Sequence, residues 1–125
     1  MNQVTEVNDR GIVDPSHPPI IDSAVLTASS KSLKAGTVLK FTSNAETFEP
    51  AGANDTPACV LMDDVEAHAS EEVNARVLRH GLVVKSRLLN YASTSEVAAG
   101  DTLINKLPAV GIYPTSGVWN ESNFN

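Results

Sequence analysis

The sequence predicts a small, mainly β domain with a minor helical part and a barrel-like fold. Short aliphatic and β-branched runs are separated by turn residues, and one long segment alternates apolar with polar side chains. The 125 residues suffice for one hydrophobic core and therefore predict a single domain. Because only 5% of the residues are aromatic, we expect this core to consist of Val, Leu, Ile and Ala.

The first part of the chain, residues 1–19, predicts an extended N-terminal arm. It is polar and acidic, and three of its last five residues are prolines. Proline lacks an amide donor and fixes φ, so the end of the arm is neither a helix nor a central strand. Apolar residues at 20–21 and 24–26 anchor the arm or begin the first strand. We therefore place the folded domain at 20–113.

Three further strands are predicted in the first half of that domain. Residues 34–41 form a strand entered through a glycine, and 48–50 form a short return whose proline indicates a sheet edge. A Gly, Asn, Asp and Pro turn at 52–57 precedes the run 58–62. This run is continuously apolar, which suits a strand covered on both faces.

Residues 70–81 satisfy the rules for a helix as well as those for a strand. Ser70 suits a helix cap, the glutamates after it suit a helix N-terminus, and Gly81 suits a helix end. However, Val73, Ala75 and Val77 alternate with polar residues, and the β-branched character continues past Gly81. The local pattern by itself therefore leaves helix and strand open for this segment.

The last third of the chain carries weaker signals. Residues 95–100 suit one or two helical turns, although 90–106 as a whole is a weak helix former. The tail, 114–125, is polar but contains Trp119, which predicts that the tail docks on its own subunit or on a neighbour.

Composition excludes several classes of function. The formal charge of −6 opposes nucleic-acid binding, which depends on Lys and Arg displacing counterions from phosphates. Cys59 is the only cysteine, so the chain forms no internal disulfide, and its apolar neighbours predict a buried thiol. The N-terminal sequence lacks the pattern of a signal peptide, and no run has the length of a membrane helix. We expect a protein that is made in the cytoplasm and does not bind membranes.

The candidate chemistry is sparse. Asp64, Glu66 and His68 share one face of an extended segment, and alternate oxygen and nitrogen ligands are able to hold a divalent ion. An acidic, solvent-facing loop is the simpler interpretation, since there is no glycine to fold a calcium loop and no second ligand cluster. No nucleophile elbow or phosphate-binding glycine loop is present. We therefore expect no enzyme activity and no cofactor.

Four segments in this order resemble one known family: AGTVLKF, PACVLMDDVEA, ARVLRHGLVVKSRL and LPAVGIY. Their spacing is similar to that in the lambda-type head decoration, or capsid-stabilising, proteins of tailed bacteriophages. The resemblance covers about 33–113. It implies a β-tulip domain in which 70–81 is a strand, a short helix follows the long strand, and 107–113 is the closing strand. It also implies a homotrimer on the outer capsid surface of the virion that clamps the major capsid protein at local three-fold positions.

The Pro-rich start suggests which residues contact the capsid, because an extended arm suits strand addition to an exposed sheet edge. We predict capsid contacts from Val13, Pro18, Pro19, Ile20 and Ile21, and a subunit contact from Trp119. Two alternatives remain. One is a small β-barrel ligand-binding or metal-binding module, or an enzyme subunit, with its ligand among Asp64, Glu66, His68 and His80; the other is a fibre or tail accessory protein.

Overall fold

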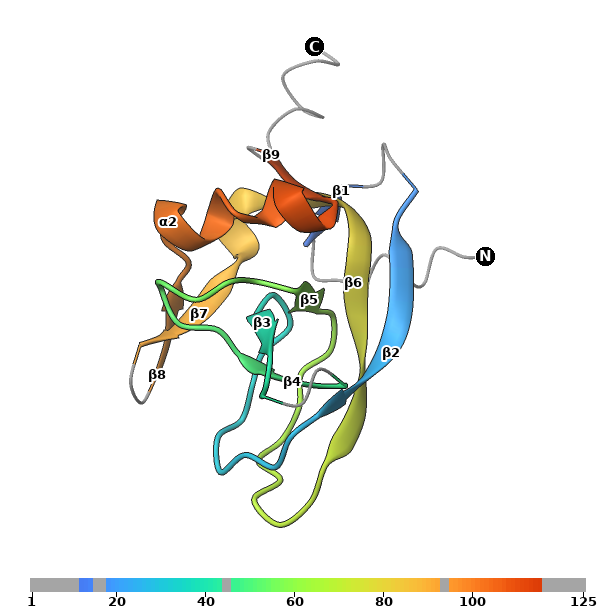
Figure 1. Ribbon diagram of the computed structural model, residues 1–125, viewed down its shortest axis with the longest axis vertical. Helices are drawn as coiled ribbons and strands as arrows, with labels where there is room; N and C mark the ends of the chain where they lie inside the picture. The colour runs from blue at the N-terminus through green and yellow to red at the C-terminus, as the bar shows by residue number, and fades with distance from the viewer. Residues whose placement is uncertain (1–11, 15–17, 44–45, 93–94, 116–125) are drawn as a thin grey trace.

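A closed five-stranded β-barrel forms the body of the molecule (Figure 1). The computed structural model describes residues 12–14, 18–43, 46–92 and 95–115. The barrel strands are β2 (Ile20–Leu26), β3 (Val38–Phe41), β4 (Thr47–Pro50), β5 (Cys59–Leu61) and β6 (Val73–Val84). They follow one another around the barrel as β6, β2, β4, β3 and β5, and β5 pairs with β6 to close the ring. The predicted mainly β, barrel-like fold is confirmed.

Short elements extend one end of the barrel. Two strands, β1 (Val13–Asp14) and β9 (Ile112–Thr115), pair with the last residues of β6. The hairpin of β7 (Leu89–Ala92) and β8 (Ser95–Ala98) forms a separate two-stranded sheet. In the described ranges the helical elements are the 3₁₀ turn η1 (Lys85–Arg87), α2 (Asp101–Ile104) and the 3₁₀ turn η2 (Leu107–Val110). Within the described ranges, no helix combines the length and the apolar character that crossing a membrane demands.

Strand alternation divides the buried residues between two cores. The first core fills the barrel, because every barrel strand contributes to it: Ala24, Leu26, Leu39, Phe48, Cys59, Leu61, Ala75 and Val77. The second core lies between the barrel wall and the short helices: Ile12, Val38, Val60, Met62, Leu78, Val83, Leu103, Leu107 and Ile112. Adjacent residues of β5 thus enter different cores, which explains why the run 58–62 is apolar throughout.

The ambiguous segment around Gly81 is a strand. β6 runs from Val73 to Val84 and pairs with β2 on seven residues, from Leu26 opposite Val73 to Ile20 opposite His80. The segment is not a helix, despite the helix signals at its start, because its apolar residues pack into both cores. Only an extended chain places side chains on two opposite faces in this way. Tertiary packing therefore overrides local propensity here.

The folded domain reaches beyond the predicted limits of 20–113. Ile12 is 1% exposed and belongs to the second core, and its carbonyl oxygen accepts a hydrogen bond from the Val84 amide. At the other end, β9 continues to Thr115. Part of the predicted arm, β1, is thus a strand of the domain. Residues 1–11 and 15–17 of the arm lie outside the described ranges.

Three local predictions are wrong. Residues 95–98 form β8 rather than helical turns, and the short helix begins only after Gly100. Residues 107–110 form η2, because Pro108 suits a helix start and Gly111 ends the turn with a φ of 87°, so the closing strand starts at Ile112. Finally, β4 is not an edge, since it pairs with both β2 and β3. Pro50 is tolerated because β2 pairs only with Thr47 and Phe48.

Candidate interaction surface

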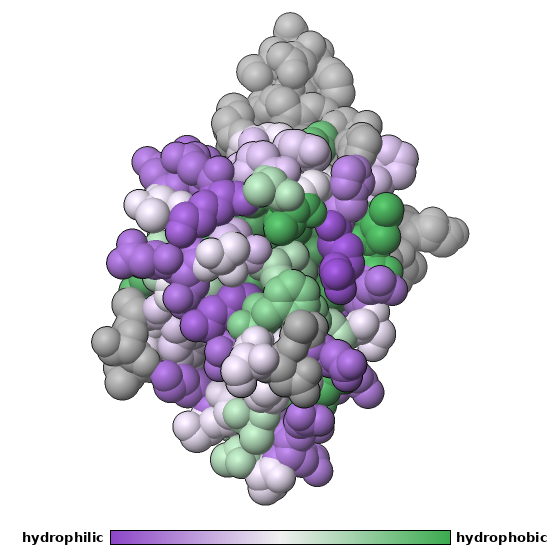
Figure 2. All heavy atoms as spheres, in the orientation of Figure 1, coloured by the Kyte–Doolittle hydropathy of each residue, from purple (hydrophilic) through white to green (hydrophobic). Residues whose placement is uncertain are grey.

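The most exposed large hydrophobic side chain among the described residues lies at the start of β2. Ile20 is 55% exposed, and Pro18 and Pro19 before it are exposed as well. A space-filling view shows hydrophobic atoms gathered over this part of β2 (Figure 2). A single exposed aliphatic residue is ordinary, whereas a contiguous exposed apolar patch marks a contact site.

Residues of β6 and β9 extend this patch. Ile20 pairs with His80, and the His80 ring meets the Tyr113 ring edge-on with 6.2 Å between the centroids. Pro19 lies so close to β6 that a Cβ on Gly81 would be 3.3 Å from the Pro19 Cα. Tyr113 is 43% exposed. We call this patch, made of Pro18, Pro19, Ile20, His80 and Tyr113, the β2 surface.

One edge of β2 is open beside this surface. β2 pairs with β6 along its whole length, but β4 reaches only Val25 and Leu26. Within the described ranges no strand pairs with the β4-side edge of 20–24. Unpaired backbone groups on an extended strand are a template for another extended segment. The β2 surface therefore offers main-chain hydrogen bonds as well as apolar contacts.

The structure separates the predicted capsid-contact residues into two groups. Pro18, Pro19 and Ile20 lie together on the β2 surface. Val13 instead pairs with Val83 within the domain, and both Val13 and Ile21 are half-buried against the second core. Alternation along β2 explains the division, because Ile20 and Ile21 face opposite sides. Trp119 lies outside the described residues.

Tyr113 and His80 were not predicted as members of this surface. Tyr113 joins this surface because β9 pairs in parallel with β6. This pairing places Tyr113 opposite Leu82, two residues after His80. That pairing joins residues about thirty positions apart, so no local pattern reveals it. The one sequence signal is the alternation in a strand, which turns Tyr113 to the face opposite that of Ile112. In the structure Ile112 is buried and Tyr113 is exposed.

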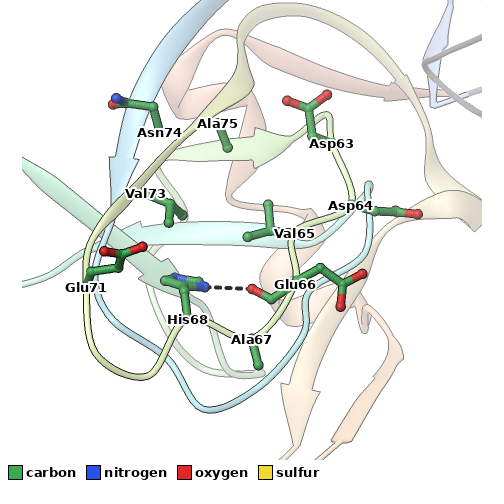
Figure 3. A pocket seen from close by; sticks show the side chains of 10 residues that line it. All are labelled: Asp63, Asp64, Val65, Glu66, Ala67, His68, Glu71, Val73, Asn74 and Ala75. Carbon is green, nitrogen blue, oxygen red and sulfur yellow. Dashed lines mark hydrogen bonds between the residues drawn. The ribbon is translucent and has the colours of Figure 1, made fainter.

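The predicted ligand residues border an acidic hollow at the opposite end of the barrel, where the loop after β5 turns (Figures 1 and 3). The hollow has a volume of about 580 Å³. Its lining residues are Asp63, Asp64, Val65, Glu66, Ala67, His68, Glu71, Val73, Asn74 and Ala75. It is thus formed almost entirely by one loop and the beginning of β6.

Both aspartates at the rim accept hydrogen bonds from the protein. Asp64 Oδ1 accepts the Ala35 amide at 2.9 Å, and this bond joins the loop to the start of the turn before β3. Asp63 accepts hydrogen bonds from the backbone and side chain of Arg76. Both carboxylates therefore hold the loop in place, Asp64 against the turn before β3 and Asp63 against β6.

His68 is the buried residue of this loop, and its ring is held by two carbonyl oxygens. Nδ1 lies 2.8 Å from the Glu66 oxygen and Nε2 lies 2.8 Å from the Thr27 oxygen. Both ring nitrogens are therefore engaged with carbonyl oxygens of the protein. Neither nitrogen directs a lone pair into the hollow, which a metal ligand must do.

The described residues do not assemble the metal site of the alternative interpretation. No group of three or more His, Cys, Asp or Glu side chains in these ranges has the geometry to hold an ion. His80, a further ligand in the alternative interpretation, packs against Tyr113 on the β2 surface and does not line the hollow. The simpler interpretation of the loop, an acidic and solvent-facing turn, fits this arrangement.

The single cysteine is enclosed in the barrel core. Cys59 is 0% exposed, and burial raises the pKa of its thiol to about 12. A thiol with so high a pKa carries almost no thiolate at neutral pH, and the thiolate is the reactive form.

Comparison with known proteins does not add to this geometry. The sequence matches no protein-family model and no curated protein sequence.

Proposed function

We propose that this chain is a head decoration protein of a tailed bacteriophage. In this proposal it binds the outer surface of the expanded capsid as a homotrimer at local three-fold positions. The observation that carries the proposal is the β2 surface, where Pro18, Pro19 and Ile20 lead into an open strand edge. A protein that acts by docking needs such a surface.

The distribution of charge supports the same role. The chain has a net charge of −6, and its acidic loop closes the end of the barrel away from the β2 surface (Figure 1). If the β2 surface lies against the capsid, the acidic loop faces the solvent. Negative charge on that outer face repels free nucleic acid and keeps decorated particles apart.

Stabilisation follows from binding linkage. A protein that binds only the expanded capsid lowers the free energy of that state by RT ln(1 + [L]/Kd). This is about 2.7 kcal/mol per site at a concentration one hundred times Kd. The effect adds over the many sites of a shell. It requires no cofactor and no chemical step, only a difference in affinity between expanded and unexpanded capsids.

Selective co-sedimentation tests the proposal. Purified protein is mixed with expanded and with unexpanded heads of its phage, and the bound fraction is measured. We expect binding to expanded heads only. Equal binding to both forms, or binding to neither, contradicts the proposal.

Two charge-introducing variants test whether the β2 surface makes the contact. Ile20→Arg places a cation in the centre of this surface, and we expect at least a tenfold loss of affinity for expanded heads. Val97→Arg is the matched control, because Val97 is also an exposed aliphatic residue, 42% exposed, but lies on β8. If both variants bind as the wild type does, the β2 surface is not the docking site.

A further inference from the structure

A second, smaller hollow lies between η1, the end of β8 and α2. Its lining residues are Lys85, Ser86, Ala98, Ala99 and Ile104, and its volume is about 240 Å³. Two alanines and the isoleucine supply apolar atoms, and Lys85 supplies a charged rim. We call this second hollow the η1 hollow.

The described chain ends next to the η1 hollow. Thr115, the last residue of β9, pairs with Val84, and the Thr115 hydroxyl donates a hydrogen bond to the Val83 carbonyl. Paired strands lie about 4.8 Å apart, and successive Cα atoms are about 3.8 Å apart. The Cα of Lys85, the residue after Val84, is therefore at most about 9 Å from that of Thr115.

The following residues have the length and the chemistry to reach this hollow. Residues 116–125 come after Thr115, and Trp119 is the fourth of them and the only tryptophan of the chain. Four extended residues span up to about 14 Å, which exceeds the distance to Lys85. Gly117 in the intervening sequence permits a sharp change of direction.

The lining of the η1 hollow suits an indole ring. Apolar alanine and isoleucine atoms contact the ring face, and an ammonium at the rim attracts the π electrons of tryptophan more strongly than those of other aromatic rings. Lys85 has only a long ion pair, 3.6 Å to Asp101, and both side chains are more than half exposed. Its ammonium therefore loses little by turning to an aromatic ring.

We propose that Trp119 docks in the η1 hollow of its own chain. Because both lie on one chain, the effective concentration of the ring at the hollow is in the millimolar range, and a weak contact suffices for occupancy. This docking covers the exposed apolar surface next to β8 and fixes the direction in which residues 116–125 leave the domain. It is independent of capsid binding.

Intrinsic fluorescence of the full-length protein tests the proposal, since Trp119 is its only source of tryptophan emission. We expect emission at a shorter wavelength, and weaker quenching by iodide, than in the urea-unfolded protein. Ala98→Glu fills the hollow, and we expect it to move the emission to the unfolded position. Ala67→Glu, an equally exposed alanine in the acidic loop, is the matched control and leaves the emission unchanged.

Two further measurements separate the possible occupants. Emission that stays constant over a hundredfold dilution indicates docking within one chain, whereas loss of the short-wavelength emission on dilution assigns the ring to a neighbouring subunit and overturns the proposal. Nuclear Overhauser contacts between the indole and the Ile104 or Ala98 methyl groups are expected in the wild type, where folding is not in question. Their absence, like unfolded-type emission, overturns the proposal.

Discussion

Arg76 and Asp63 are joined by three hydrogen bonds. The guanidinium donates from Nε and from an Nη atom to Asp63 Oδ1, at 3.0 and 2.8 Å, while the Arg76 amide donates to Oδ2 at 2.9 Å. Asp63 follows β5 by two residues, and Arg76 lies within β6. The contact therefore fixes the start of the acidic loop to the strand that closes the barrel.

Removing the Asp63 charge is expected to destabilise the protein. Charged hydrogen bonds contribute ~1.5–3 kcal/mol, and since both side chains are about a third exposed, solvent screening reduces this to about 1 kcal/mol for Asp63→Asn. Urea unfolding measures the change. Glu66→Gln, an exposed acid in the same loop, is the control and is expected to be near neutral. Equal stability of the two variants contradicts the assigned role of Asp63.

The same pair predicts a loss of stability in acid. Burial raises the pKa of Asp63, but the hydrogen bonds and the positive charge of Arg76 together lower this pKa by more than burial raises it. The pKa of Asp63 therefore lies below its ordinary value of 3.8. Because folding lowers this pKa, the ionised Asp63 contributes its full stabilisation at a pH above the pKa of the unfolded chain. This stabilisation is lost as the pH falls through the pKa of the folded protein. We expect the difference between wild type and Asp63→Asn to shrink below about pH 4. A difference that persists at pH 2 excludes this charge effect.

Gly111 is expected to resist substitution by alanine. Its φ is 87°, and an added Cβ would lie 2.8 Å from His80 Nδ1, so the new methyl group must displace a ring on the β2 surface. The left-handed backbone alone costs ~1–2 kcal/mol in an L residue. Gly100→Ala is the matched control, because its φ of −88° is ordinary and no atom lies within 4 Å of the added Cβ. Thermal unfolding of both variants measures the contrast, and similar melting temperatures would argue against this geometry.

Ile12 is expected to stabilise the fold although it precedes the Pro-rich segment. It is 1% exposed, and truncating a buried isoleucine costs ~2–5 kcal/mol, so Ile12→Ala should strongly lower the free energy of unfolding. Ile20→Ala removes the same atoms from a side chain that is 55% exposed, and we expect a loss below about 1 kcal/mol. Chemical denaturation measures both values. A reversed order would mean that β1 does not pack as described.

The Cys59 thiol should be inert in the folded protein. Its pKa is raised to about 12 by burial, and no surface of the side chain is open to a reagent. We expect no reaction with a thiol-specific disulfide reagent at pH 8, and complete reaction after unfolding in urea. Rapid labelling of the native protein at this pH would show that the barrel opens at β5.

Local sequence patterns predicted the strands better than the segments around them. The apolar run 58–62 identified β5, since a strand between two cores needs apolar residues on both faces. Residues 95–98 suited helical turns by composition, since alanine and glutamate favour helices, yet cross-strand pairing with β7 places them in β8. The resemblance implied a strand over the whole of 107–113, but Pro108 and Gly111 set a 3₁₀ turn before β9.

The candidate surface was predicted in part. Proline at 18 and 19 identified an extended and exposed segment, and Ile20 follows it on the same face. Val13 was assigned to the same surface because it lies near the Pro-rich start of the chain. Its strand partner, Val83, is seventy residues away, and only the folded chain shows that the two strands pair. Non-local pairing of this kind leaves no periodic signal near either strand.

The termini of the described chain meet at one residue of β6. Val84 donates its amide to the Ile12 carbonyl and pairs with Thr115. A short linker between the two ends would therefore leave the barrel intact, and new ends would open at the exposed turn 53–54. The fold is thus suited to circular permutation, and a peptide joined directly to Ile12 or to Thr115 would leave the domain beside Val84.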